Sequence, residues 1–389
     1  MDYEAFKHSI SGKLVPTIDG ARAFVPAPLP PTLNVAEFAD ALADAALRIG
    51  ELRGVGTTIS NPYVLIRPLQ RSEAVASSAI EGTITSLAQL MLFEARAPSQ
   101  GRRNEAHEVR NYVHALEHGI GRLSQLPVSL RLMSELHEIL LEGVAGFRGG
   151  RVRPGEFRMD QNWIGAPGDN IHSARFVPPP PQEMKLALGA LEKFIHSNDD
   201  TVPHVLVHLA LIHYQFEAIH PFPDGNGRVG RLLIPLIMAE RELMSQPLLY
   251  LSSYLERYKQ AYYDRMLEVS RSGAWSEWIR FFLGAVAAQA KDTIDRVHDL
   301  RQLQGEYRDR LQSTRTTAFA LQLADAVFER PYISVPDATR ILGVTYRAAR
   351  NTIDRLTRAD ILRELPGPNH PKLFLAHGVF GILNRPGTF

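Results

Sequence analysis

The chain has 389 residues, 45% hydrophobic and 22% charged, which is the composition of a globular protein with room for two or three domains. The 43 Lys and Arg residues nearly balance 42 Asp and Glu residues, and the formal net charge of +1 excludes a surface built throughout for nucleic acid or an anionic membrane. The absence of cysteine excludes disulfides, thiol nucleophiles and zinc–thiolate sites. No secretory signal pattern begins the sequence, and Leu232–Ala239 and Phe281–Ala288 are too short to cross a bilayer, so we expect a soluble cytoplasmic protein.

The chain begins with a segment of little helical character. Its first 34 residues contain five prolines and no helical period, which predicts an extended arm. Apolar residues at spacings of three and four then predict an amphipathic helix over Val35–Leu52, ended by Gly54 and Gly56. Gln70–Ala95 predicts a helix or a close pair, interrupted near Gly82. Further helices are expected at Asn104–Leu123, Ser129–Glu142, Pro181–Ser197, Val202–Ile219, Val229–Glu242, Leu255–Ser270 and Trp275–Gln304.

One segment between these helices has a different pattern. Between residues 151 and 181, Gly, Pro, Asn and Asp residues separate the short apolar groups Asn162–Ala166 and Ala174–Val177. Turn-forming residues between apolar runs are typical of a β-hairpin. A hairpin-like flap on a helical body is therefore predicted.

The tail after about residue 315 changes character again. Helices are expected at Phe319–Phe328, Val335–Leu342 and Tyr346–Ala359, with Gly343–Thr345 as a tight turn. Arg363–Ala376 is expected to form two short strands about a turn at Pro366–Pro371. Helix, turn, helix and hairpin is the pattern of a winged-helix domain. The prediction is a mainly α-helical protein divided at about 1–100, 101–300 and 301–389.

The most informative run is His220–Arg231, HPFPDGNGRVGR. Gly225, Gly227 and Gly230 have the spacing of a dinucleotide-binding loop, but such a loop follows a strand, and here the preceding segment is helical. Backbone N–H groups at Gly225–Gly227 suit an anion at the start of the next helix. Arg228 and Arg231 share one helix face and have donors suited to phosphate oxygens.

Two other side chains complete this run. Asp224 offers the kind of oxygen that Mg²⁺ uses beside substrate phosphates, and His220 titrates near neutral pH. The combination predicts a polyphosphate–Mg²⁺ site with a base at its edge. The alternative is a solvated turn, with His220 at the end of a helix.

The run resembles the signature of the Fic family, His-x-Phe-x-Asp/Glu-Gly-Asn-Gly-Arg-x-x-Arg, at every defined position. Tyr214–Ile219, Leu249–Ser252 and Tyr262–Tyr263 are also similar to family sequence. The resemblance covers roughly Leu33 to Ala288 and, more loosely, the tail. It implies a Fic-type helical bundle that transfers AMP from ATP to a hydroxyl group of a protein, with release of pyrophosphate.

The resemblance also implies a role for each residue of the signature. His220 would be the base that deprotonates the target hydroxyl, and Asp224 would bind Mg²⁺ at the α- and β-phosphates. Gly225, Asn226 and Gly227 would form the anion hole, with Gly230 in the same nucleotide-binding run. Arg228 and Arg231 would hold the β- and γ-phosphates.

Further residues are implied around the nucleotide. Ser173, Ala174, Arg175 and Phe176 of the flap would lie beside it, and the flap edge would bind the target protein as an added strand. An ordinary surface hairpin is the alternative. Tyr262 and Tyr263 would line the adenine pocket or, equally, form a buried aromatic pair.

Upstream, Ser77–Gly82 matches the family's inhibitory motif, Ser/Thr-x-x-x-Glu-Gly/Asn. Ser77 and Glu81 are four residues apart and therefore lie on one helix face. The resemblance implies that Glu81 pairs with Arg231 in the position of the γ-phosphate, with Gly82 closing the motif. Without the rest of the signature, Glu81 would be interpreted as a solvated helix charge.

Other polar and aromatic residues carry weaker signals. His204, His208 and His213 are expected to pack along a helix rather than bind a metal, and Trp275 and Trp278 are expected in the core. In the tail, Arg347, Arg350, Arg355 and Arg358 stand against Asp354 and Asp360. This mild basic excess favours contact with protein or self-association over DNA binding.

Two functions from different classes follow. The first is an autoinhibited protein adenylyltransferase that uses ATP and Mg²⁺ and modifies Ser, Thr or Tyr of target proteins or of itself. The second is a DNA-binding or protein-interaction regulator whose Fic core binds nucleotide but is catalytically secondary. A Fic scaffold that transfers phosphate, UMP or phosphocholine is a third. A homo-oligomer is compatible with each of them.

Overall fold

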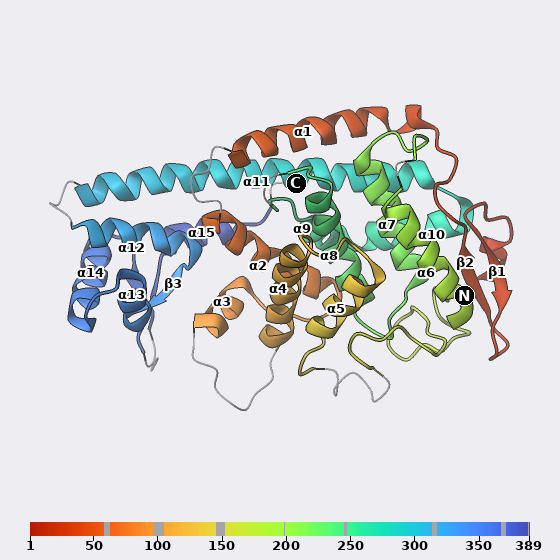
Figure 1. Ribbon diagram of the computed structural model, residues 1–389, viewed down its shortest axis with the longest axis horizontal. Helices are drawn as coiled ribbons and strands as arrows, with labels where there is room; N and C mark the ends of the chain where they lie inside the picture. Colours follow the sequence, from red (N-terminus) through yellow and green to blue (C-terminus); the bar gives the residue numbers. More distant parts are fainter. Residues whose placement is uncertain are drawn as a thin grey trace.

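The computed structural model describes residues 1–57, 63–95, 105–144, 152–197, 199–244, 247–312, 317–366, 371–387 and 389. The molecule is mainly α-helical, and one long helix connects its parts. Helix α11 (Trp275–Gln312) extends along most of the molecule, and α1 (Ala39–Thr57) packs beside it (Figure 1). No helix in the described ranges is both long and apolar enough to cross a membrane.

The body of the molecule is a bundle of helices on one side of α11. Its helices are α2 (Tyr63–Ile80), α3 (Leu87–Ala95), α4 (Glu105–Arg122), α5 (Leu130–Leu140), α6 (Pro181–Ile195), α7 (Val205–Ile219), α8 (Asn226–Glu240), α9 (Ser252–Arg257) and α10 (Lys259–Ser272). Helix α8 begins three residues earlier than predicted, so the end of the glycine-containing run belongs to its first turn.

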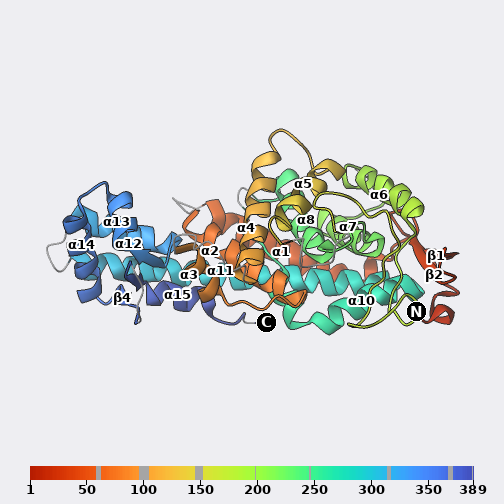
Figure 2. The same ribbon diagram turned by 90° about the horizontal axis from the view of Figure 1, so that it is seen from below.

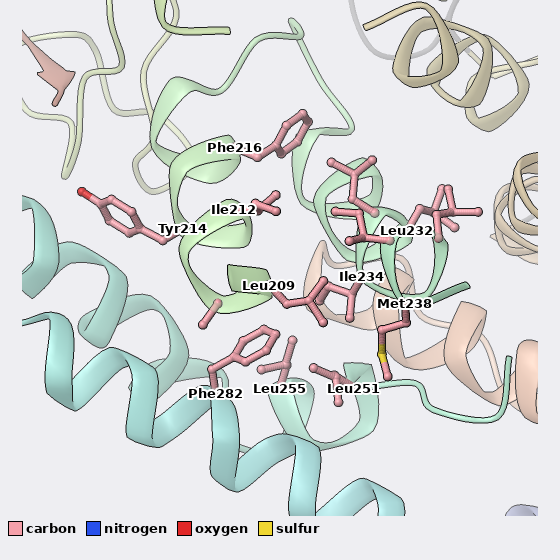
Figure 3. Close-up of a cluster of buried hydrophobic side chains, with 14 of the residues drawn as sticks. Leu209, Ile212, Tyr214, Phe216, Leu232, Ile234, Met238, Leu251, Leu255 and Phe282 are labelled. Atoms are coloured by element: carbon pink, nitrogen blue, oxygen red, sulfur yellow. The ribbon is translucent and has the colours of Figure 1, made fainter. Parts of the chain in front are cut away.

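Helices α7 and α8 form the centre of the body. The sequence of α7 is apolar on nearly every side, as expected of a helix enclosed by others. Its Leu209 and Ile212 meet residues of α8, α9 and α11, among them Ile234, Leu255 and Phe282 (Figure 3). Because both helices are enclosed by packed side chains, the loop that joins them has firmly placed ends.

The N-terminal arm is not extended throughout, so that prediction was wrong. Strands β1 (Gly12–Pro16) and β2 (Arg22–Pro26) form an antiparallel hairpin, with Leu14 opposite Phe24. Prolines are tolerated because they lie at strand ends, where no ladder donor is lost. Short 3₁₀ helices lie on either side, at η1 (Tyr3–Phe6) and η2 (Val35–Glu37).

Two predicted helix boundaries were also wrong. Helix α1 does not end at Gly54 and Gly56 but continues to Thr57. A Cβ atom on Gly56 would lie 3.2 Å from a methyl group of Leu248, so the glycine permits close packing rather than ending the helix. The predicted helix Leu255–Ser270 is two helices, α9 and α10, which meet at Tyr258.

The flap is less regular than the predicted hairpin. Its two apolar groups are joined by one bridge, in which Ile164 and Phe176 exchange backbone hydrogen bonds of 2.8 and 3.0 Å. Between them, Asp169 accepts from the Ala166 N–H, and Asn170 accepts from the Ser173 N–H. These local side-chain bonds favour turns over a longer ladder. Residue 151 lies outside the described residues.

The tail contains the predicted helix–turn–helix followed by short strands. Its elements are α12 (Ala318–Glu329), β3 (Tyr332–Ser334), α13 (Val335–Leu342), α14 (Tyr346–Arg358), β4 (Arg363–Glu364), β5 (Leu373–Leu375) and α15 (His377–Asn384). The strands form an antiparallel sheet in the order β3-β5-β4. Most of the tail lies at one end of α11 in both views (Figures 1 and 2). Most of the turn predicted at Pro366–Pro371 lies outside the described residues.

The hydrophobic core of the tail is distinct from that of the body but extends into two helices outside the tail. The hydrophobic cluster of the tail includes Leu87 and Met91 of α3, together with Val297 and Leu300 of α11. Helix α12 also packs against α2. The segment that carries Ser77 and Glu81 is therefore in contact with the tail at both ends, through α2 and α3. The boundary expected near residue 100 lies outside the described residues, and α11 crosses residue 300 without a break.

Candidate active site

The segment from His220 to Gly225 joins α7 to α8, and its shape is held by Asn226. The Asn226 Oδ1 accepts from the Phe222 N–H at 2.7 Å, and its Nδ2 donates to the Phe222 carbonyl at 2.8 Å. Gly225 has φ +78°, a conformation that favours glycine, and precedes α8. The loop therefore directs backbone N–H groups of the first turn of α8 outward, which is the geometry of an anion site.

His137 of α5 supports this loop, although the sequence analysis did not select it. Its Nδ1 accepts from the Gly155 N–H at 2.9 Å, so its Nε2 carries the proton and donates to the Asp224 carbonyl at 3.0 Å. Its ring also stacks on Phe222 with centroids 4.0 Å apart. Burial lowers the pKa of His137 to about 4, which keeps the ring neutral. A lone histidine on an amphipathic helix gives no local signal of this role.

His220 ends α7 in the left-handed conformation, with φ +50°. Its Nδ1 lies 3.3 Å from the Glu217 carbonyl oxygen, which only accepts, so Nδ1 carries the proton and Nε2 holds a free lone pair. Burial and the charge of Arg158 lower the pKa of His220 to about 4. At neutral pH the imidazole is therefore an available base.

The two arginines of α8 are both buried. Arg231 donates from Nε to the Ser77 Oγ at 2.8 Å and from Nη2 to the Ser77 carbonyl at 3.0 Å. Arg228 lies 3.6 Å from a carboxylate oxygen of Glu108 and 3.9 Å from one of Asp224. Buried arginines beside a helix N-terminus make this a strongly positive region.

Glu81 occupies this positive region. Its Oε1 accepts from Arg231 Nη2 at 2.7 Å, which is the ion pair that the family resemblance implies. Burial alone would raise the pKa of Glu81, but the charge of Arg231 and this hydrogen bond lower it below its ordinary value. A Cβ atom on Gly227 would lie 2.1 Å from the same oxygen, so the carboxylate rests directly on the glycine. Gly82, with φ +89°, turns the chain after Glu81.

Glu217 is a second carboxyl group near Arg231 that the sequence analysis did not select. Burial raises its pKa to about 8, and the charge of Glu81 adds to this effect while Arg231 opposes it. Gly230 leaves the necessary space, because a Cβ atom there would lie 2.6 Å from the Glu217 Oε1. At neutral pH the Glu217 carboxyl group is largely protonated.

Tyr262 and Tyr263 lie on α10, with ring centroids 5.2 Å apart. Tyr262 is fully buried, and its hydroxyl group donates to His213 Nε2 at 2.7 Å, since His213 Nδ1 donates to the Gly230 carbonyl.

Of the other histidines of this region, His204 caps α7 and His208 contacts the Phe194 carbonyl. Trp275 and Trp278 are buried, as predicted.

The four flap residues divide into two pairs. Ala174 is buried with Ala21 and Ala23, and Phe176 packs on Phe24, so their side chains fix the flap to the N-terminal hairpin. Arg175 forms an ion pair with Asp264 of α10. The Ser173 Oγ donates to Asp169 at 2.9 Å. Only Ser173 and Arg175 of the four thus have side chains in polar contacts.

A comparison with protein families identifies the family of this chain. Models described as "Fic/DOC family N-terminal" and "Fic/DOC family" match residues 39–121 and 127–238, about half of the chain. The chain belongs to the Fic/DOC family. The matched residues include Ser77, Glu81, His137 and the whole run from His220 to Arg231.

Individual relatives support the same membership. "Protein adenylyltransferase Fic" of Drosophila sechellia is 27% identical over 208 residues, which cover 53% of this chain and 38% of that protein. The protein of the same name in Drosophila yakuba is 31% identical over 165 residues, covering 42% and 30%. The chain thus spans less than two fifths of the length of these relatives.

Solved structures of Fic proteins have a similar fold. A Fic family protein from Desulfovibrio desulfuricans superposes with a TM-score of 0.56 at 20% identity, over 90% of this chain and 98% of that one. Residues 134–508 of Fic-1 from Caenorhabditis elegans give 0.52 at 18% identity, over 67% and 74%. The coverage of the first shows that its similarity extends beyond the body into the tail.

The residues of this Fic site fit Mg²⁺ only together with a nucleotide. In the described part of the chain, no three His, Asp or Glu side chains converge as a metal cage. Asp224 presents a partly exposed carboxylate beside the N-terminus of α8, and its Oδ1 accepts from the Gly225 N–H at 2.7 Å. One carboxylate plus phosphate oxygens is a common Mg²⁺ environment.

Proposed function

We propose that this Fic chain is an autoinhibited protein adenylyltransferase, which transfers AMP from ATP to a hydroxyl group of a target protein or of itself. The observation that carries this proposal is the pairing of a free His220 Nε2 with an adjoining anion site. That site holds the Glu81 carboxylate in place of a phosphate. Relatives named protein adenylyltransferase support the same chemistry.

The transfer step follows from the residues at hand. The His220 Nε2 takes the proton of the target hydroxyl group while the hydroxyl oxygen forms a bond to the α-phosphorus. The bond from that phosphorus to the bridging oxygen of pyrophosphate breaks, and pyrophosphate leaves. Arg228, Arg231 and the N–H groups that start α8 hold the β- and γ-phosphates. Asp224 would hold Mg²⁺, which supplies further neutralisation of phosphate charge.

The inhibition follows from where Glu81 lies. Its carboxylate contacts Arg231 and the backbone at Gly227, the two groups proposed to hold the γ-phosphate. A phosphate and a carboxylate cannot share this position, because both are anions and both need the same donors. ATP would then bind with its phosphates displaced and its α-phosphorus out of line with the target hydroxyl.

Removal of the base tests the activity. In a Glu81→Gly background, we expect His220→Ala to lower AMP transfer at least about 100-fold while ATP binding persists, because the ring takes a proton but holds no phosphate. Incorporation of radiolabelled AMP and calorimetric ATP binding measure the two properties. His114→Ala, on the exposed side of α4, is the control and should leave both unchanged. Transfer that persists in His220→Ala would contradict the assignment.

Removal of the carboxylate tests the inhibition. We expect Glu81→Gly to raise self-transfer of AMP by about tenfold or more, because Arg231 becomes available to the γ-phosphate. Glu81→Gln keeps the size of the side chain but not its charge and should have a smaller effect. Both variants are compared with the parent by circular dichroism to verify folding. An unchanged rate in both folded variants would exclude an inhibitory role for Glu81.

The tail supports a second, subordinate proposal. The order of its helices and strands supports a winged helix, whose recognition helix would be α14. Two arginines of α14 already have partners, because Arg350 pairs with Asp354 at 3.0 Å and Arg355 donates to Thr317. This partial neutralisation favours contact with protein or a second copy over DNA. A mobility-shift assay with salt dependence distinguishes the two.

A further inference from the structure

Arg158 is a buried cation in the segment that leads into the flap, and the residue is only 3% exposed. In the described part of the chain, no carboxylate lies within ion-pair distance of it. Its guanidinium instead donates to backbone carbonyls, at 2.9 Å from Nε to His220, at 3.1 Å from Nη1 to Asp160, at 3.4 Å from Nη2 to Ile219, and from Nη2 to Pro179.

These carbonyls belong to three different parts of the site. Ile219 and His220 end α7, where carbonyls lack helical partners. Asp160 and Pro179 lie on the two sides of the flap where it leaves the body. The backbone N–H of Arg158 also donates to the Pro221 carbonyl at 2.9 Å. One residue thus joins both sides of the flap to the start of the catalytic loop.

The conformation of His220 needs such support. A left-handed residue other than glycine costs about 1 kcal/mol or more, and it persists only where its surroundings hold it. Arg158 binds the carbonyl of His220, while the Phe216 carbonyl accepts from its N–H at 2.9 Å. Together these bonds fix the peptide groups on both sides of the imidazole.

We propose that Arg158 is a positioning residue for the transfer reaction: it fixes the backbone of His220 and keeps the flap in register with the catalytic loop. The inference rests on the proposed adenylyltransferase function. The buried guanidinium bonds to backbone carbonyls, among them that of His220, so it would act through His220. The planar guanidinium group of arginine has several N–H donors and suits this role, and a lysine would satisfy fewer of the carbonyls.

The charge of Arg158 also acts on His220. Other charged groups that face the imidazole are Glu81, which follows α2, and Asp224 of the catalytic loop, and both favour the protonated ring. Burial comes first in lowering the pKa of His220 to about 4, and Arg158 adds to it. Loss of the Arg158 charge therefore raises this pKa, so that protonation removes the base at a higher pH.

The test compares Arg158→Gln and Arg158→Lys in the Glu81→Gly background, with kcat, the KM for ATP and the pH profile of AMP transfer as readouts. We expect Arg158→Gln to lower kcat about 10- to 100-fold through misplacement of the base, with KM changed less than about threefold. Its activity should also fall between pH 7 and pH 5, where the parent stays level. Arg158→Lys should lower kcat but keep the parent's pH profile.

Arg153→Gln is the control, because Arg153 lies in the same segment but is exposed and pairs with Glu156. Its kinetics should equal those of the parent. Equal kcat and superimposable pH profiles for Arg158→Gln and the parent would overturn the proposal, as would a loss of thermal stability without either kinetic change. If Arg158→Gln does not fold, Arg158→Lys decides by the split between kcat and KM. Absence of AMP transfer in the Glu81→Gly parent would overturn the proposed function and this inference with it.

Discussion

Arg231 lies in the field of two carboxyl groups that are in different protonation states. Glu81 is an anion, since Arg231 holds its pKa below the ordinary value, whereas burial raises the pKa of Glu217 to about 8. The difference has a structural origin, because Glu81 forms a direct hydrogen bond to the guanidinium and no such bond holds Glu217. One arginine therefore neutralises one carboxylate and leaves the other protonated.

This arrangement predicts a pH-dependent stability. The pKa of Glu217 in the folded state lies above its pKa in the unfolded state. When the pH exceeds the unfolded-state pKa, the carboxyl group must therefore take up a proton for the chain to fold. The free energy of unfolding should fall between about pH 4.5 and pH 8 for this reason. Glu217→Gln should remove the fall and be more stable than the parent at pH 9, by up to about 5 kcal/mol, and nearly equal at pH 5.

Thermal unfolding at pH 5, 7 and 9 measures this difference. Glu256→Gln, at an exposed position of α9, is the matched control and should follow the parent at each pH. A stability difference between Glu217→Gln and the parent that does not change with pH would contradict the prediction. Such a result would mean that Glu217 is ionised in the folded protein across this range.

At the residue scale, the sequence predicted the members of the motif but not their supports. His220, Asp224, Arg228 and Arg231 occur at a fixed local spacing, which a sequence displays directly. His137 and Arg158 reach their partners across 87 and 62 residues, respectively, and bind them through backbone carbonyls. Backbone atoms have no residue type, so no pattern of side chains announces such contacts.

At the element scale, α2 is the helix that must hold Glu81 in place. Glu73, two turns before Glu81, accepts from the Tyr112 hydroxyl at 3.0 Å and from the N–H of Ser252 at 3.0 Å, as well as from its hydroxyl group. Ser252 is the first residue of α9, so the carboxylate satisfies an N–H group that the helix leaves without a partner. Three elements are thereby fixed to one another through one buried side chain.

Replacement of Glu73 should therefore destabilise the protein. We expect Glu73→Ala to lower the free energy of unfolding by about 2–4 kcal/mol, because Tyr112 and Ser252 are left buried without their acceptor. Glu73→Gln keeps one carbonyl acceptor, so its free energy of unfolding should fall by less than that of Glu73→Ala. Equilibrium unfolding in urea measures both. Equal losses in the two variants would show that the hydrogen bonds at this carboxyl group do not carry the effect.

Helices were easier to predict than the remaining elements. Residue periodicity indicated α6, α13 and α14 nearly to the residue, because each has an amphipathic face and a recognisable boundary. The N-terminal hairpin was missed because its prolines lie at strand ends, where they are tolerated. Gly54 and Gly56 do not end α1, and the sequence does not show that the side chain of Leu248 packs against the helix at Gly56.

At the scale of the whole molecule, the tail holds the segment that carries Glu81. Its α12 packs on α2, where Arg67 pairs with Glu329 at 3.0 Å, and its core includes Leu87 and Met91 of α3. Glu81 lies between these two contacts in the sequence. We therefore expect a change in the tail to affect the position of Glu81 through α2 and α3. The sequence did not predict this link, because α3 and the tail are more than two hundred residues apart.

Reversal of one charge on α12 should weaken the inhibition. Glu329→Lys places a cation against Arg67 and costs about 1 kcal/mol at this partly exposed contact. If all of that cost is expressed in the position of α2, the rate of AMP transfer rises at most about fivefold. Asp325→Lys is the matched control, because Asp325 lies on the same helix but pairs with Arg308 of α11 at 3.1 Å. It should not change the rate.

A combination of variants shows whether this effect passes through Glu81. In a Glu81→Gly background the carboxylate proposed to inhibit is absent, so Glu329→Lys should raise AMP transfer no further. A similar increase with and without Glu81 would mean that the tail acts on the active site by another route. Equal rates for Glu329→Lys and the parent, with Glu81 present, would instead show that α2 keeps its position when this contact with the tail is lost.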